Sequence, residues 1–138
     1  MDKELRREII LDNYQNPFNK KVPEGDYIKV NTNNESCIDN IDIYFKIENN
    51  ILKDVAFDGE ACAISTSATS IMLRNLIGKN IEEIKIILEN YKNMINEKEY
   101  DKEVLKDLNA YDEIYLQPNR KTCALLPVRA IEKILKDY

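Results

Sequence analysis

The chain has 138 residues, a formal net charge of -5 and hydrophobic residues at 43% of its positions, which suffices for the core of a single domain over residues 1–138. Its acidic balance disfavours contact with a phosphate backbone, so we expect no nucleic acid partner. No apolar run approaches the roughly 20 residues that span a bilayer, and the charged first residues differ from a signal peptide, so we expect a cytoplasmic protein and no membrane.

The first half of the chain predicts one helix and then antiparallel strands. The expected elements are a helix over residues 3–15 and strands over residues 27–30, 41–47 and 51–57. Asn16-Pro17 ends the helical pattern, because proline disfavours a helical residue before it. The two longer strands alternate apolar and polar side chains, which is typical of half-buried strands. Asn49-Asn50 between them tolerates positive φ angles and predicts a two-residue hairpin turn.

The second half of the chain predicts mainly helices. The expected elements are helices over residues 62–78, 80–95 and 123–138, with a short helix within residues 97–115. Asn80 and Glu83 have the spacing of a capping pair at the start of the second of these helices. Pro127 is acceptable only in a first helical turn, so we expect the last helix to begin close to Cys123.

Cysteine and histidine usage limits the chemistry of any site. The chain has three cysteines, no CxxC pair and no histidine. An odd number of thiols cannot form a closed disulfide framework, so we expect reduced cysteines. The lack of histidine excludes serine-histidine and cysteine-histidine catalysis within this chain. Any bound metal ion must therefore be held by thiolates and carboxylates.

The hairpin predicts which of these side chains lie together. With a turn centred on Asn49-Asn50, opposed residues have numbers that sum to 99, as those of Cys37 and Cys62 do. Asp39 lies two residues from Cys37, so both side chains point to the same side of an extended chain. Cys62 and Cys123 are each expected at a helix N-terminus, where the helix dipole favours a thiolate. The pattern predicts a candidate site of three sulfurs and one oxygen.

Plainer interpretations of the same residues remain open at this stage. Free cysteines are often buried as small hydrophobic residues. Asp39 is also explained as a solvated turn residue or cap, and the serines and threonines of residues 65–70 as a close helix-packing surface. Arg120 is either a surface cation or a fixed charge that favours the thiolate of Cys123 and holds Asp39 or a partner's carboxylate.

Four motifs follow one another along the chain. They are Asn16-Pro17, C-x-D at Cys37 and Asp39, FDGEACAISTSATSIM at residues 57–72, and P-x-R-x-x-C-A-L-L-P at residues 118–127. This order resembles the iron-sulfur cluster assembly proteins related to IscU and the NifU N-terminal domain, over nearly the whole chain. Arg120 stands where IscU-type proteins have a ligand histidine, and the interval from Cys62 to Cys123 is long. Both features are similar to the SufU branch of the family.

The resemblance implies a fold, a metal and a partner. The fold would be α+β, with a small antiparallel three-stranded sheet and helices packed on it. A Zn²⁺ ion would be held by Cys37, Asp39, Cys62 and Cys123. The partner would be a SufS-type pyridoxal-phosphate cysteine desulfurase, with other cluster assembly proteins as further partners. Cys37 would accept sulfur once a histidine of the desulfurase replaces it on zinc, and Arg120 would be auxiliary. The chain would then act as a sulfurtransferase-like partner and not as an independent enzyme.

The sequence departs from the family pattern at two positions. Ile38 and Ala61 replace the usual glycines beside the first two cysteines, which stiffens the loops there.

The main alternative to sulfur transfer is a scaffold function, in which the same four residues transiently hold a [2Fe-2S] cluster. The other is a metal-free interaction module that uses the serine- and threonine-rich surface.

Overall fold

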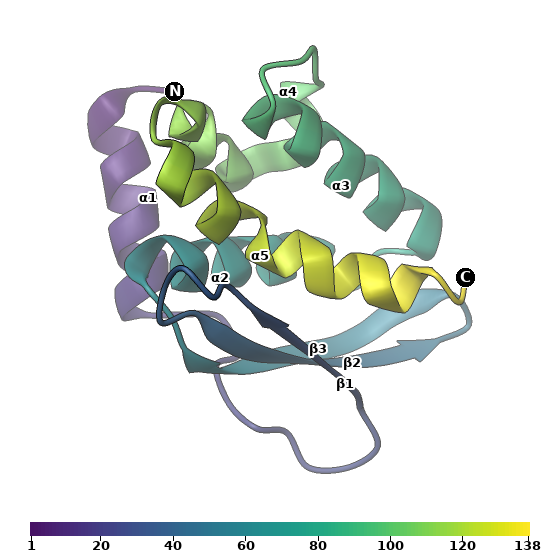
Figure 1. The fold of residues 1–138 in the computed structure, drawn as a ribbon. Coiled ribbons are helices and arrows are strands. Elements are labelled where there is room, and N and C mark those ends of the chain that lie inside the picture. The colour runs from purple at the N-terminus through teal and green to yellow at the C-terminus, as the bar shows by residue number, and fades with distance from the viewer.

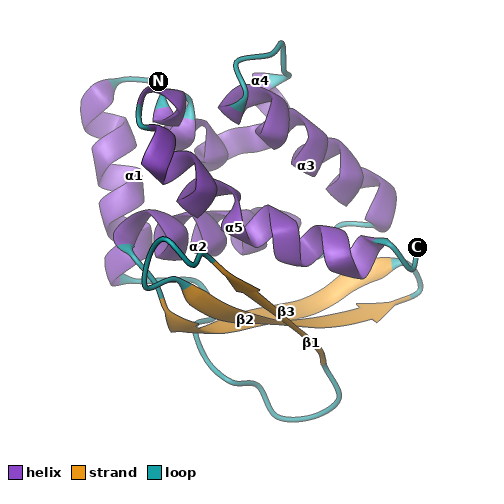
Figure 2. Cartoon of the chain, viewed as in Figure 1, coloured by secondary structure: helices purple, strands orange, loops and turns teal.

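The computed structural model describes residues 1–138 as a three-stranded antiparallel sheet with helices packed over one face (Figure 1). The strands are β1 (Ile28–Asn33), β2 (Asn40–Glu48) and β3 (Ile51–Glu60), side by side in that order. The helices are α1 (Lys3–Gln15), α2 (Ala63–Leu76), α3 (Ile81–Ile95), α4 (Lys102–Leu105), η1 (Lys106–Tyr111), η2 (Ile114–Leu116) and α5 (Pro118–Leu135). The predicted α+β fold is confirmed, and Figure 2 shows its two layers.

The N-terminal helix α1 has the predicted bounds. The side chain of Asp2 accepts a hydrogen bond from the N–H of Glu4 and caps the first turn. The helix ends before Asn16-Pro17, as expected. Ser70 Oγ of α2 donates to Oδ1 of the buried Asn13 at 2.8 Å, so a hydrogen bond between side chains fixes α1 against α2.

The β2–β3 hairpin confirms the predicted turn and corrects the predicted register. Asn49 and Asn50 have φ angles of 52° and 63°, as a type I′ turn requires. The pairs of Glu48 and Ile47 beside the turn follow the predicted sum of 99, but from Lys46 to Asn40 the register is shifted by one residue. The cause is a β-bulge, which adds one residue to β3 and lets both Leu52 and Val55 be buried. The register prediction is therefore wrong by one residue at the far end of the hairpin.

Helices α2 and α3 begin where the sequence predicts. Cys62 is the N-cap of α2, and the side chains of residues 65–70 behind it are all buried, so the predicted packing surface is confirmed. Asn80 and Glu83 form the predicted capping box at the start of α3. The helix α2 lies between α1 and α5 and contacts both, which makes it the centre of the helical layer.

The last helix begins earlier than predicted. Pro118 occupies the first turn of α5, where its missing N–H costs no hydrogen bond, and Cys123 lies in the second turn. Pro127 lies inside the helix and cannot donate to the carbonyl of Cys123. Ser65 Oγ lies 3.3 Å from that carbonyl oxygen, so a polar atom of α2 faces the carbonyl that the proline leaves unpaired. The helix thus continues through a proline that the local rule excludes.

The segment between α3 and α5 is anchored in the core by an aromatic pair. Tyr91 of α3 and Tyr111 of η1 meet edge to face, with ring centroids 6.4 Å apart. The hydroxyl of Tyr91 donates to the carbonyl of Ala124 at 2.8 Å, and Tyr111 shares a 2.6 Å hydrogen bond with Ser67. The segment therefore packs against the two helices that carry Cys62 and Cys123. No helix in the structure combines the length and the apolar character needed to cross a membrane.

Candidate metal centre

Four potential metal ligands converge at one end of the sheet. Cys37 and Asp39 lie on the loop between β1 and β2, Cys62 precedes α2, and Cys123 lies on α5. One ligand atom of each lies within 4.8 Å of the others. The predicted proximity of Cys37 to Cys62 therefore holds despite the register shift, because both lie beyond the paired ends of the strands.

The chemistry of these donors fits a zinc ion. Tetrahedral zinc with bonds of about 2.3 Å to sulfur separates its ligand atoms by about 3.8 Å, so donors within 4.8 Å need little movement. Thiolate-rich sets favour zinc or an iron-sulfur cluster over hard cations such as Mg²⁺. Three thiolates and one carboxylate around one divalent ion carry a net charge of -2. The site therefore needs hydrogen-bond donors around its sulfurs and oxygen.

Asp39 is held by the N-terminal turn of α2. The backbone N–H of Cys62 donates to its Oδ1 at 2.7 Å, and Ser65 Oγ donates to its Oδ2 at 2.5 Å. Burial by itself raises the pKa of the Asp39 carboxyl, but these hydrogen bonds outweigh burial and leave the pKa below its ordinary value. The carboxylate is thus charged and oriented. Asp39 is buried, so the interpretation as a solvated turn residue is wrong.

Cys62 combines two roles at the start of α2. Its Sγ accepts a hydrogen bond from the N–H of Ser65 at 3.4 Å, which caps the helix through a thiol instead of the usual hydroxyl or carboxylate. Cys62 thus lies at a helix N-terminus, as predicted. The side chain is only partly buried, so its sulfur is open to a metal ion and to the ligands around it.

Cys123 is buried and does not lie at a helix N-terminus. Burial, and then the hydrogen bond with Asp39, raise the pKa of its thiol to about 12. The predicted thiolate stabilisation by the helix dipole is therefore wrong for this residue, because α5 begins at Pro118. A metal ion held here would displace the proton of this thiol. Asn34 Nδ2 points an N–H group at Cys123 Sγ from 3.7 Å.

The mouth of the site is polar. A surface pocket of about 420 Å³ lies over Cys37 and is lined by Asn34, Ser36, Cys37, Pro118, Asn119, Arg120, Thr122 and Cys123. Arg120 is exposed and takes part in none of the ion pairs of the molecule. Asp39 is held by backbone and hydroxyl donors, so Arg120 is left free to meet a ligand or partner that enters the pocket.

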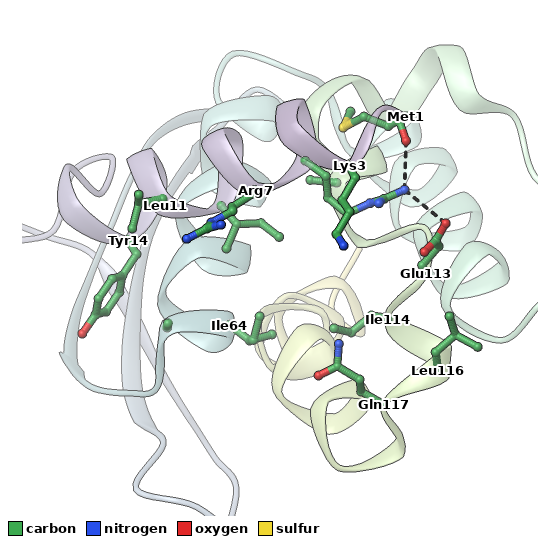
Figure 3. Close-up of a pocket in the computed structure, with 14 residues that line it drawn as sticks. Met1, Lys3, Arg7, Leu11, Tyr14, Ile64, Glu113, Ile114, Leu116 and Gln117 are labelled. Carbon is green, nitrogen blue, oxygen red and sulfur yellow. Dashed lines mark hydrogen bonds and ion pairs between the residues drawn. The ribbon is translucent and has the colours of Figure 1, made fainter.

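A larger groove opens beside the α2 end of the site. It has a volume of about 680 Å³ and lies between α1, the start of α2 and η2 (Figure 3). Leu11 and Tyr14 line one side, Ile114 and Leu116 the other, and Ile64 lies between them. The groove thus brings an apolar surface within two residues of Cys62.

Sequence patterns indicated the four candidate ligands but missed the residues that contact and orient them. Asn34 and Ser65 each contact ligands from other parts of the chain. The spacing of Ser65, three residues after the N-cap Cys62, is the one signal that predicts a contact, because this is the capping-box distance. Nothing in the sequence relates Asn34 to Cys123, which lies 89 positions away.

Known proteins share both the sequence pattern and the fold. The family model described as NifU-like N terminal domain matches residues 5–138. The chain is 38% identical over 130 residues to a Bacillus subtilis protein named zinc-dependent sulfurtransferase SufU, covering 94% of this chain and 88% of that protein. It is 33% identical over 136 residues to a Thermotoga maritima protein named iron-sulfur cluster assembly scaffold protein IscU, covering 97% and 94%.

Solved structures agree with these sequence matches. The crystal structure of FiSufU, a SUF-system protein from Fervidobacterium islandicum AW-1, superposes with a TM-score of 0.89 at 30% identity and covers 97% of this chain and 99% of that one. A NifU-like N-terminal protein from Brucella abortus has the same fold, with a TM-score of 0.82 at 20% identity over 94% of this chain and 90% of that one. The Fervidobacterium islandicum and Thermotoga maritima proteins are both named for iron-sulfur cluster assembly. The chain belongs to the NifU-like N-terminal domain family.

Proposed function

We propose that the protein binds zinc through Cys37, Asp39, Cys62 and Cys123 and accepts sulfur at Cys37 from a SufS-type pyridoxal-phosphate cysteine desulfurase. The sulfur then enters iron-sulfur cluster assembly. The four donors within 4.8 Å support the metal site, and the name of the Bacillus subtilis relative supports zinc and sulfur transfer. In this function the chain is a sulfur acceptor that works with an enzyme.

The surroundings of the three sulfur atoms support Cys37 as the sulfur acceptor. Cys62 Sγ accepts the N–H of Ser65, and Cys123 Sγ faces the amide of Asn34. Cys37 Sγ has no hydrogen-bond partner, and its side chain is partly exposed at the polar pocket. A hydrogen bond to a thiolate lowers its nucleophilicity, and burial blocks its approach. Cys37 is therefore the sulfur best placed to leave the metal and react.

The transfer itself needs no oxidant or reductant. The Cys37 thiolate attacks the terminal sulfur of the partner's persulfide, a new sulfur–sulfur bond forms, and the partner's own sulfur–sulfur bond breaks. The partner's cysteine leaves as a thiolate, and Cys37 becomes the persulfide. When bound, zinc would keep the thiols deprotonated at neutral pH and would exchange ligands without a strong geometric preference. Arg120 at the pocket mouth is the cation placed to meet a carboxylate of the incoming partner.

The first test measures the desulfurase. Adding the zinc-loaded protein to a SufS-type desulfurase and cysteine should increase alanine production, and Cys37→Ala should abolish the increase. Ser36→Ala is the matched control, because Ser36 is an exposed neighbour on the same loop and its hydroxyl makes no hydrogen bond. The proposal would be contradicted if alanine production did not rise with the native protein, or if it rose equally with Cys37→Ala.

A scaffold function uses the same four residues. The Thermotoga maritima relative is named as a scaffold protein, and thiolate ligands hold [2Fe-2S] clusters as well as zinc. Anaerobic reconstitution with iron and sulfide separates the two functions. A coloured cluster that forms at near-stoichiometric iron and passes to an acceptor protein would favour the scaffold. Retention of one equivalent of zinc under the same conditions would favour sulfur acceptance.

A further inference from the structure

Asn34 makes four hydrogen bonds around the candidate metal centre. Its backbone N–H donates to the carbonyl of Asp39, and its own carbonyl accepts the N–H of Cys37, each at 3.0 Å. Its Oδ1 accepts the N–H of Ser36 at 3.1 Å, and its Nδ2 faces Cys123 Sγ at 3.7 Å. The side chain is buried at 8% exposure. One residue thus shapes the loop of two ligands and contacts a third.

The contact with Cys123 matters because of the charge of the loaded site. The four ligands and one zinc ion carry a net charge of -2, and Cys123 is 1% exposed, so water reaches its sulfur poorly. The amide of Asn34 is the one N–H group in the structure within hydrogen-bond distance of this sulfur. Without it, the buried thiolate would have no N–H group facing it, and such a charge is costly to bury.

We propose that Asn34 is a positioning residue that holds Cys123 as a permanent thiolate ligand while the neighbouring Cys37 remains exchangeable. The hydrogen bond to Cys123 spreads the negative charge of its sulfur and fixes the sulfur toward the ion. The backbone bonds of the same residue place Cys37 at the pocket without touching its sulfur. This inference rests on the metal binding of the proposed function and is independent of the sulfur transfer.

Two variants separate the turn from the contact with sulfur. Asn34→Asp keeps an oxygen for the N–H of Ser36 but has no N–H group to donate to Cys123. Asn34→Ala loses both contacts and introduces no charge. Asn33→Asp is the matched control, because Asn33 is the exposed neighbour whose amide contacts only Asn31, at 3.1 Å. Circular dichroism identifies any variant that does not fold.

The measurements are zinc affinity by chelator competition and the absorption spectrum of the cobalt-loaded protein. Residues that orient metal ligands typically contribute about 10- to 100-fold to affinity, so both Asn34 variants should bind zinc at least about tenfold more weakly. Their sulfur-to-cobalt charge-transfer band should move to lower energy, because a hydrogen bond stabilises the sulfur lone pairs. Asn33→Asp should match the native protein in both measurements.

Several outcomes overturn the inference. Native zinc affinity with a native charge-transfer band in either folded Asn34 variant would show that the donor is not needed. A loss in Asn34→Asp alone would trace the effect to the new charge, and a loss in Asn34→Ala alone would trace it to the turn. A loss of the same size in Asn33→Asp would attribute it to the strand end in general. If zinc binding follows the prediction but sulfur transfer fails, this inference stands and the proposed function falls.

Discussion

Ser65 shows how one buried hydroxyl serves both the fold and the site. Its Oγ donates to Asp39 Oδ2 at 2.5 Å and lies near the carbonyl of Cys123 that Pro127 leaves without a helical partner. Its backbone N–H donates to Sγ of the N-cap residue Cys62. The packing surface predicted for residues 65–70 is confirmed. The prediction did not identify Ser65 as a residue that contacts three of the four candidate ligands.

Removing this hydroxyl should weaken the metal site as well as the fold. Ser65→Ala leaves a buried carboxylate oxygen without its donor, which should lower the free energy of unfolding by about 1 to 3 kcal/mol. Because Asp39 is then less well oriented, zinc affinity should fall about tenfold or more. Ser67→Ala is the matched control, since Ser67 is equally buried and bonds Tyr111 instead of a ligand. Urea unfolding and chelator competition on both variants measure the two effects.

The control variant decides what the result means. Ser67→Ala should lose stability by a similar amount and keep native zinc affinity. Equal zinc affinities for the two variants would contradict the role of Ser65 at the site. At the residue scale, sequence reasoning therefore identifies ligands by type and spacing, but it does not identify Ser65 or Asn34, because their partners lie 26 and 89 positions away along the chain.

At the scale of elements, local signals set the ends of most helices and strands, and tertiary contacts set the exceptions. Asn49-Asn50 and the Asn80–Glu83 capping box are local signals, and both predictions are confirmed. The bulge in β3 is not a local signal, because it depends on which residues the helical layer buries. Pro118 is a local signal for the start of α5, but Pro127 inside the helix obscures it in the sequence.

Gly59 near the end of β3 leaves no room for a side chain. Its φ is +136°, and a Cβ there would lie 2.2 Å from the carbonyl oxygen of Asn40 on β2. Gly59→Ala should therefore move the end of β3 away from β2 and lower the free energy of unfolding by at least about 2 kcal/mol. Because β3 leads directly to Cys62, zinc affinity should fall too. Urea unfolding and chelator competition measure both.

Gly78→Ala is the control for this variant. Gly78 also has a positive φ, +83°, but no atom lies within 4 Å of the position of its Cβ. Its substitution should cost about 1 kcal/mol of backbone strain and leave zinc affinity unchanged. If Gly59→Ala were no more destabilising than Gly78→Ala, the close approach of β2 and β3 would not be the reason for a glycine at this position.

At the scale of the whole molecule, the site unites parts of the chain that are far apart in sequence. The loop before β2, the start of α2 and the second turn of α5 each supply candidate ligands, and α2 packs directly against α5. The resemblance in motif order predicted this fold and the grouping of these four side chains. Side-chain orientation came only from the structure, because it depends on how the helical layer packs on the sheet.

In the proposed function, Cys37 accepts sulfur while Asp39, Cys62 and Cys123 retain the zinc ion. The most direct measurement is peptide mass spectrometry of the zinc-loaded protein after brief reaction with a SufS-type desulfurase and cysteine, together with zinc analysis of the same sample. We expect one added sulfur atom on the peptide that contains Cys37, none on the peptides of Cys62 and Cys123, and one retained equivalent of zinc. Sulfur added first to Cys62 or Cys123, or no added sulfur while the desulfurase turns over, would contradict it.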